Sequence, residues 1–166
     1  MEYERHMRRA LALAAEAADE GEVPVGCVIV DGAGAVVAEG RNHREAERTV
    51  TGHAELEALD AACRARGDWR LDDCTAFVTL EPCPMCAGAM INARLGRLVY
   101  GAREPRFGSA ASVLNLFEER YPSRTAILGG VLAEESEELL RRFFGRLREE
   151  EPTPGSPSGG TVSEAD

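Results

Sequence analysis

Two short motifs, each placed where a helix is expected to begin, constrain this chain more than any other feature. The first is His53-Ala54-Glu55, and the second, Pro-Cys-Pro-Met-Cys, runs over residues 82–86. Cys83 and Cys86 are three residues apart, so on a helix their sulfur atoms lie on one face. The first turn of a helix has free N–H groups and the positive end of the helix dipole, which favour thiolate over thiol. The two motifs therefore predict two helix N-termini carrying an imidazole and two thiolates.

This set of donor atoms indicates zinc, because two thiolates and an imidazole suit that ion better than magnesium or calcium. His53, Cys83 and Cys86 supply three ligands, whereas a structural zinc site is closed by four. A catalytic site keeps the fourth position for water, and zinc lowers the pKa of that water to about 7. Glu55 follows the histidine by two residues and can take the proton and pass it to a leaving group. The pattern favours a hydrolytic zinc site with Glu55 as the proton shuttle.

A structural zinc site closed by another cysteine is the main alternative. The chain has five cysteines, and the three outside the motif are Cys27, Cys63 and Cys74. Cys27 lies in an apolar run and Cys63 lies among alanines, and a free cysteine is commonly buried as a small hydrophobe. An odd number of cysteines without a secretory signal also argues against a disulfide framework. We therefore expect these three cysteines to be core residues.

The length and the termini predict one folded domain and a tail. The 166 residues fit a single domain of roughly 150 residues. The first residues lack the basic and then apolar order of a secretory signal, and no apolar run approaches the roughly 18 residues of a membrane span. We expect a cytoplasmic protein without a membrane segment. Residues 1–148 are predicted to form the domain, and residues 149–166, which are acidic and rich in Pro, Gly and Ser, a disordered tail.

Hydrophobic periodicity predicts alternating helices and strands. Helices are expected over residues 3–19, 53–66, 83–93, 109–119 and 134–148, and a loop over residues 40–52. Strands are expected over residues 23–30, 75–80, 98–101 and 126–132, with another beginning at residues 35–38. This order predicts a three-layer α/β/α sandwich around a central five-stranded mixed sheet.

The motifs and their surroundings resemble the bacterial tRNA-specific adenosine deaminases, which have the cytidine deaminase fold. The His-x-Glu and Pro-Cys-x-x-Cys elements are the signature of zinc deaminases. The likeness covers about residues 3–148. The segments that carry it are Gly21-Glu22-Val23-Pro24-Val25-Gly26, Arg41-Asn42, His53-Ala54-Glu55, residues 78–90 and Gly129-Gly130-Val131-Leu132.

The resemblance implies roles for particular residues. His53, Cys83 and Cys86 would bind one zinc ion per subunit, and Glu55 would be the proton shuttle. The residues implied to bind the substrate are Asn42, Val25, Ala54, Pro82 and Arg106. The implied substrate is the wobble adenosine of a tRNA anticodon loop, hydrolysed to inosine by a homodimer whose two subunits both touch RNA. Anticodon loops suit such an enzyme because their unpaired bases can be splayed into a cavity at low cost.

The charge of the chain is unusual for an RNA partner. The net charge is −10, and without residues 149–166 it is still −5, whereas phosphate binding needs a basic surface. We therefore expect the RNA to meet a local rim over residues 94–106, where Arg94, Arg97, Arg103 and Arg106 outnumber Glu104. The chain departs from the family pattern at Glu104, at Ala111 and at Pro122-Ser123, all in the region where RNA contacts are expected.

Three hypotheses of function follow from these patterns. The first is deamination of the wobble adenosine of tRNA. The second is an enzyme of the same fold that acts on a free base or nucleoside such as guanine, cytosine or cytidine, which the acidic charge favours. The third is a zinc module without catalytic activity that binds RNA or a protein, and Glu55 argues against it because a structural site has no use for that carboxylate.

Overall fold

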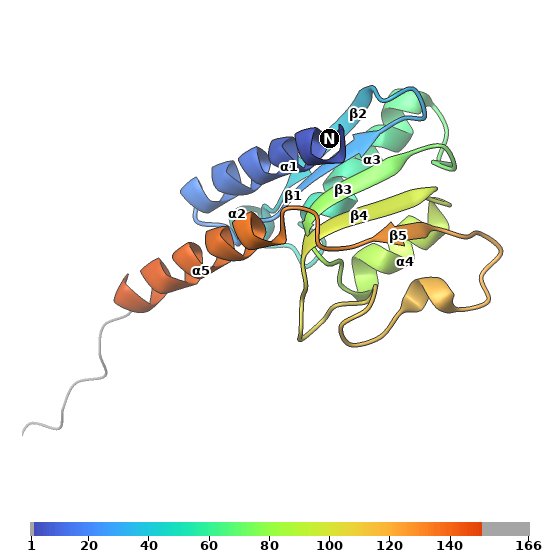
Figure 1. Ribbon diagram of the computed structural model, residues 1–166. Helices are drawn as coiled ribbons and strands as arrows, with labels where there is room; N and C mark the ends of the chain where they lie inside the picture. Colours follow the sequence, from blue (N-terminus) through green and yellow to red (C-terminus); the bar gives the residue numbers. More distant parts are fainter. Residues whose placement is uncertain (1, 151–166) are drawn as a thin grey trace, which may run out of the picture.

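The computed structural model describes residues 2–150 as a five-stranded mixed sheet with helices on both faces (Figure 1). The strands are β1 (Gly26–Val30), β2 (Val36–Arg41), β3 (Thr75–Leu80), β4 (Arg97–Ala102) and β5 (Ala126–Leu128). Their order is β2-β1-β3-β4-β5, and the first three pair antiparallel while β3, β4 and β5 run parallel. The predicted three-layer sandwich is confirmed.

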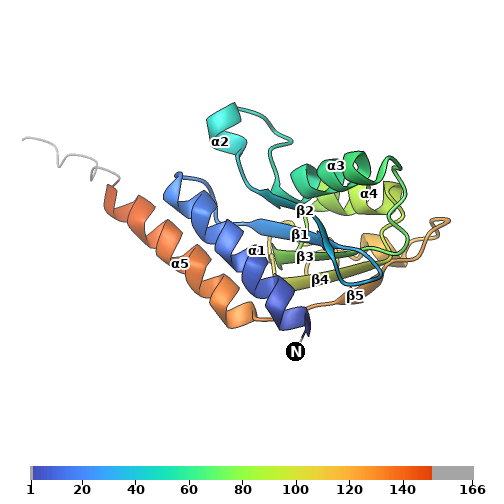
Figure 2. The ribbon, with the colours of Figure 1, turned by 90° about the horizontal axis from the view of Figure 1, so that it is seen from above.

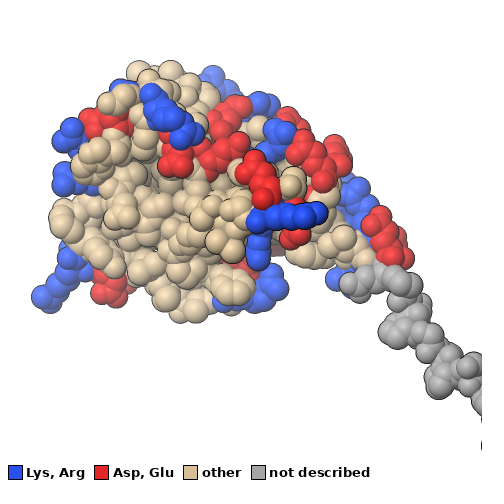
Figure 3. All heavy atoms as spheres, turned by 180° about the vertical axis from the view of Figure 1, so that it is seen from behind, with Lys and Arg blue, Asp and Glu red and all other residues tan. Residues whose placement is uncertain are grey.

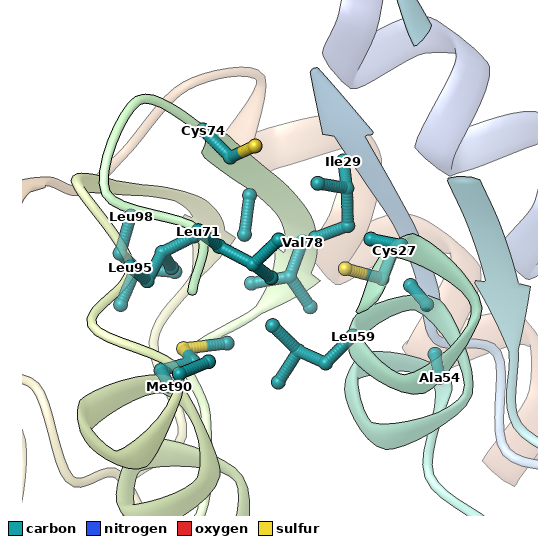
Figure 4. Packing of buried hydrophobic residues seen from close by; sticks show 14 of the residues in the cluster. Cys27, Ile29, Ala54, Leu59, Leu71, Cys74, Val78, Met90, Leu95 and Leu98 are labelled. Atoms are coloured by element: carbon teal, nitrogen blue, oxygen red, sulfur yellow. The ribbon is translucent and has the colours of Figure 1, made fainter. Parts of the chain in front are cut away.

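Helices cover the sheet in two pairs (Figure 2). The helices α1 (Glu2–Asp19) and α5 (Ala133–Glu150) lie side by side on one face, while α3 (Ala54–Arg66) and α4 (Pro84–Asn92) lie on the other. A core separates each pair from the sheet, and Met7 and Phe77 belong to the one beneath α1. The other core packs Leu59 and Met90 against Val78 (Figure 4). The sheet therefore holds α3 and α4 next to each other on a rigid support.

Both metal-ligand motifs begin helices, as predicted. His53 is the N-cap of α3 and Cys83 is the N-cap of α4, with Pro84 in the first helical turn. Proline is tolerated there because a first-turn N–H has no partner within the helix. The N-terminus of α3 lies directly on β2, because a Cβ atom added to Gly40 would lie 2.3 Å from the carbonyl oxygen of Ala54. This close approach fixes the first motif against the sheet.

One predicted helix is absent. Residues 109–119 were expected to be helical, but they form turns followed by the short 3₁₀ helix η1 (Leu116–Glu118). The N–H groups of Ala110, Ala111 and Ser112 donate to the carboxylate of Glu81. Those first-turn donors would be free in a helix too, so the departure from a helix lies further along. The N–H of Leu116 donates to the carbonyl of Ser109 at 3.0 Å, and Ala110 pairs with Asn115 in an antiparallel bridge, which closes the segment as a loop.

The predicted loop over residues 40–52 is also more ordered than expected. The strand β2 continues to Arg41, and the short helix α2 (Arg44–Glu47) follows it. The carboxylate of Glu22 accepts hydrogen bonds from the N–H groups of Glu45 and Ala46 at 3.1 and 2.7 Å. A carboxylate at this position satisfies free donors of the first turn and stabilises the helix.

The other differences are at element boundaries. The first strand begins at Gly26 and not at residue 23, and the fifth ends at Leu128 before a glycine pair. The helix α5 continues to Glu150, two residues beyond the predicted domain boundary, and residues 151–166 of the predicted tail lie outside the described residues. Among residues 2–150, no helix is both long and apolar enough to cross a membrane.

Candidate metal centre

The ligand residues meet where α3 and α4 begin. His53 ends the segment that leads from β2 into α3, and Cys83 and Cys86 lie in the first turn of α4, directly after β3. Within residues 2–150, these three residues form the one group of three or more His, Cys, Asp or Glu side chains whose ligand atoms lie within 4.8 Å of one another. The predicted ligand set is therefore brought together in space.

The distances between the donor atoms fit a tetrahedral zinc ion. The Nδ1 atom of His53 lies 3.7 Å from the sulfur of Cys83 and 3.4 Å from the sulfur of Cys86. Zinc bonds of about 2.3 Å to sulfur and about 2.0 Å to nitrogen, at a tetrahedral angle, separate the two donors by about 3.6 Å. The three side chains can thus bind one ion with little rearrangement, through Nδ1 of the histidine.

The pKa values of the two thiols favour a bound cation at this site. Hydrogen bonds from Cys86 and His53 lower the pKa of the Cys83 thiol to about 4. The hydrogen bond to Cys83, together with burial, raises the pKa of Cys86 far above its ordinary value. Without a metal the two sulfur atoms therefore share one proton. A dication that replaces this proton and stabilises both thiolates is the partner that such a site requires.

Glu55 lies beside the ligands without being one of them. It occupies the first turn of α3, and 4% of its surface is exposed. Burial raises the pKa of its carboxyl to about 7, partly opposed by hydrogen bonding and by the charge of His53. A carboxyl group that titrates near neutral pH can both accept and return a proton, as a general acid–base catalyst must. The geometry and the pKa both suit the predicted proton shuttle.

A cavity of about 390 Å³ opens over the metal ligands. His53, Cys83 and Glu55 line it, and so do four of the residues expected to bind substrate: Val25, Asn42, Ala54 and Arg106. Pro82, the fifth, is buried and does not line the cavity, and its carbonyl group accepts a hydrogen bond from the N–H of Ser109 at 2.9 Å. The expected contact of Pro82 with the substrate therefore stays a prediction.

Backbone contacts hold the side chain of Asn42 in place. Its Nδ2 group donates to the carbonyl of Val23 at 3.2 Å, and its Oδ1 atom accepts from the N–H of Arg44 at 3.3 Å. An amide group has two donor hydrogens and two acceptor lone pairs. One of each therefore remains for a ligand in the cavity.

Sequence reasoning missed several residues of the cavity wall. They come from five separate segments and share only their position in the folded chain: Glu22, Val23, Arg44, Glu45, Val50, Leu80, Glu81, Met85, Glu104, Phe107 and Phe144. Phe144 is the most distant in sequence, since it reaches the cavity from α5. Its apolar spacing on an amphipathic helix could not distinguish a cavity wall from ordinary core packing.

Three of the four arginines expected at the RNA rim lie in different surroundings. Arg106 lines the metal cavity. Arg97 begins β4 at the other end of the strand, about 17 Å from Ala102 at 3.3 Å per residue, and lines a separate hollow with Tyr3. The guanidinium of Arg94 lies over the ring of Trp69 at 5.3 Å. Arg97 is thus separated from Arg106 by the length of β4, and the RNA contacts of residues 94–106 stay a prediction.

The three other cysteines do not join the metal group. Cys27 and Cys74 are buried in the core beneath α3 and α4 (Figure 4). Cys63 is half-buried, and its thiol donates to the carbonyl of Trp69 at 3.5 Å. The prediction of core positions is thus confirmed for Cys27 and Cys74 and holds in part for Cys63. The three-ligand site stands, with Glu55 as the buried carboxylate beside it.

The fold and this site together define a metal-binding α/β domain with the chemistry of a zinc hydrolase. Residues 1–102 match the family described as the cytidine and deoxycytidylate deaminase zinc-binding region. The chain belongs to this deaminase family, and His53, Cys83 and Cys86 are its candidate zinc ligands.

Similar proteins narrow the class further. The chain is 43% identical over 146 residues to the tRNA-specific adenosine deaminase of Bacillus subtilis, which covers 87% of this chain and 90% of that protein. A solved structure from a study of A-to-I editing by tRNA:A34 deaminases at the wobble position of transfer RNA is 38% identical, with a TM-score of 0.78, and the match covers 82% of this chain and 99% of that one. The X-ray structure of guanine deaminase from Bacillus subtilis is 30% identical, with a TM-score of 0.61 over 93% of this chain and 99% of that one.

Proposed function

We propose that this chain hydrolyses adenosine to inosine at the wobble position of tRNA and releases ammonia. The observation that carries the proposal is Glu55, a buried carboxyl whose pKa lies near 7, next to three metal ligands and facing a cavity. The choice of tRNA is supported by the likeness to tRNA-specific adenosine deaminases over almost the whole length of those proteins.

The residues divide the work as follows. His53, Cys83 and Cys86 hold one zinc ion, which when bound lowers the pKa of water in its open position. Glu55 accepts the two protons of the attacking water in turn and delivers one to the purine ring and the other to the departing amine, so that adenosine and water give inosine and ammonia. Asn42 donates its free amide hydrogen to the nucleoside, and Val25 and Ala54 contact the base.

One assay distinguishes this function from the alternatives. Zinc-loaded protein is incubated with an anticodon stem-loop that carries wobble adenosine, with the same stem-loop carrying uridine there, and separately with free guanine, cytosine, cytidine and adenosine. We expect ammonia and inosine from the first substrate alone. Release of ammonia from a free base or nucleoside but not from the RNA would favour the second hypothesis, to which the guanine deaminase likeness lends support. Failure to act on any substrate would favour the module without catalytic activity.

The mouth of the cavity gives a prediction about RNA binding. The side chain of Arg106 is 71% exposed beside the cavity and pairs with Glu104, whereas Arg94 lies over Trp69. We expect Arg106→Ala to raise the KM for the stem-loop several-fold with kcat unchanged. The slope of log affinity for the RNA against log salt concentration should fall by about one, which corresponds to one released counterion fewer. The matched control Arg94→Ala should leave the KM within about twofold. Equal effects of the two substitutions would contradict a role specific to Arg106.

We also propose that the chain acts as a homodimer. A broad part of the surface on the side of α4, a helix without charged residues, is free of charged side chains (Figure 3). Val50, Phe107 and Val113 are large apolar side chains that are 74, 59 and 55% exposed. Soluble monomers rarely leave large apolar patches uncovered. Light scattering at micromolar concentration is expected to give twice the chain mass of 17.9 kDa, and the mass of one chain would contradict the proposal.

A further inference from the structure

Glu81 is a buried carboxylate that is surrounded by the loop over residues 104–112. It directly follows β3, and 2% of its surface is exposed. Its N–H donates to the carbonyl of Ala102 at 2.8 Å, which extends the pairing between β3 and β4 by one step. The backbone of Glu81 is therefore part of the rigid sheet, although its side chain lies among loop residues.

Five donors converge on this one carboxylate. The Oε1 atom accepts from three successive N–H groups, those of Ala110, Ala111 and Ser112, at 3.1, 2.7 and 2.8 Å. The Oε2 atom accepts from the N–H of Glu104 at 3.1 Å and from the hydroxyl of Ser112. Successive backbone N–H groups that point at one anion form a strong binding concavity, usually for a ligand. Here the anion belongs to the protein, and it draws both ends of the 104–112 segment together.

Residues 104–112 pack so closely around the carboxylate of Glu81 that the shape of this segment depends on it. A Cβ atom added to Gly108 would lie 2.5 Å from Oε2 of Glu81 and 2.4 Å from the carbonyl oxygen of Glu104. The N–H of Gly108 donates to that same carbonyl at 2.8 Å. The residues between the two attachment points therefore have little freedom to move while Glu81 is bound.

These closed residues form one wall of the cavity. Glu104, Arg106 and Phe107 all line it, and the side chains of Arg106 and Phe107 are 71 and 59% exposed. The donors to the Glu81 side chain lie in residues 104–112, whereas Cys83 and Cys86 lie at the start of α4. The carboxylate thus acts on the wall and not on the metal ligands.

We propose that Glu81 is a positioning residue that holds the 104–107 wall in the shape that binds substrate, and that it contributes to substrate binding and not to the chemical step. The inference rests on the proposed deamination of a tRNA anticodon loop. Two departures from the family pattern fit this arrangement. Glu104 and Ala111 contact Glu81 through their backbone N–H groups, which a change of side chain at either position leaves in place.

The test compares Glu81→Gln with the matched control Glu39→Gln. Glutamine keeps the size of the side chain, but its amide group turns a donor towards other donors and lacks the charge. Glu39 also loses a strong contact on substitution, a two-point pair with Arg9 at 2.7 Å on β2, away from the cavity. Three quantities are measured for each variant: bound zinc, hydrogen exchange of residues 104–112 and of α4, and the KM and kcat for the wobble-adenosine stem-loop.

For Glu81→Gln we expect full zinc occupancy, exchange of residues 104–112 faster by about tenfold with α4 unchanged, a KM about tenfold higher and a kcat within about threefold of the parent. The Glu39→Gln variant should match the parent in the exchange of residues 104–112 and in KM. Ser112→Ala removes only the hydroxyl donor, and it should move KM and exchange in the same direction by about two- to threefold, even where Glu81→Gln does not fold.

Loss of zinc, a fall in kcat at constant KM, or unchanged exchange of residues 104–112 would each overturn the inference. Failure of the parent protein to act on the stem-loop would overturn the proposed function instead. In that case hydrogen exchange still decides whether Glu81 holds the wall, because that measurement needs no substrate.

Discussion

Glu55→Gln is expected to retain one zinc ion per chain and to lose turnover by about 10²–10⁴-fold, the usual contribution of a general acid–base group. Glutamine has nearly the same size as glutamate, so the buried first turn of α3 should keep its packing. It cannot accept a proton from water, however, and it cannot deliver one to a leaving amine. The effect should appear in kcat for the stem-loop, while zinc content is measured by mass spectrometry of the metal.

Glu57→Gln is the matched control for this substitution. Glu57 lies on the same helix two residues later, and its carboxylate accepts a hydrogen bond from the N–H of Arg41 at 2.8 Å. Its side chain is 43% exposed and does not line the metal cavity. We expect it to remain within about threefold of the parent in kcat. Loss of zinc from Glu55→Gln would show that Glu55 is a metal ligand and would refute its assignment as the proton shuttle.

The metal site could be predicted from sequence because its information is local. His53 and Cys83 are both N-caps, and the preference for a proline next to Cys83 is a property of the first helical turn itself. The spacing of Cys83 and Cys86 needs only helical geometry to bring both sulfurs to one face. Only one long-range feature is needed in addition, the proximity of the two helix N-termini. A mixed sheet covered by helices brings them together.

The cavity walls could not be predicted in the same way, because they depend on contacts between distant segments. The periodicity of residues 109–119 favoured a helix, but the segment closes on itself as a loop through the hydrogen bond from Leu116 to Ser109 and the bridge between Ala110 and Asn115. Phe144 reaches the cavity from the end of the chain. The separation of Arg97 from Arg106 has a similar cause, since the length of β4 lies between residues that are close in sequence.

The second large effect is expected on removal of the metal. Cys86→Ser should abolish zinc binding and measurable turnover, and chelation of zinc from the parent protein should do the same reversibly. The three ligands join the segment before α3 to the segment after β3, so the ion stabilises the contact between them. Saturation at about 100–1,000 times the dissociation constant stabilises the fold by about 3–4 kcal/mol, so the metal-free protein should melt about 5–15 °C lower.

Cys63→Ser is the control that distinguishes this result from a general effect of losing a thiol. Cys63 is half-buried on α3, with its thiol bonded to the carbonyl of Trp69, and we expect its variant to keep zinc and activity. Loss of zinc from Cys63→Ser would instead support a structural site closed by four ligands. Retention of zinc by Cys86→Ser, measured together with unchanged melting, would refute the ligand set.

The same site predicts how zinc binding depends on pH. In the metal-free protein the pKa of Cys86 lies above its ordinary value, so this thiol is protonated at neutral pH, whereas Cys83, with a pKa of about 4, is already a thiolate. Zinc binding must therefore release at least one proton. The hydrogen bond with Cys83 raises the pKa of His53, whose imidazolium form must also lose a proton to bind zinc. Affinity should therefore rise at least tenfold for each pH unit between pH 6 and 8, and calorimetry in buffers of different ionisation enthalpy should detect the released protons. An affinity independent of pH in this range would mean that Cys86 does not bind zinc as a thiolate.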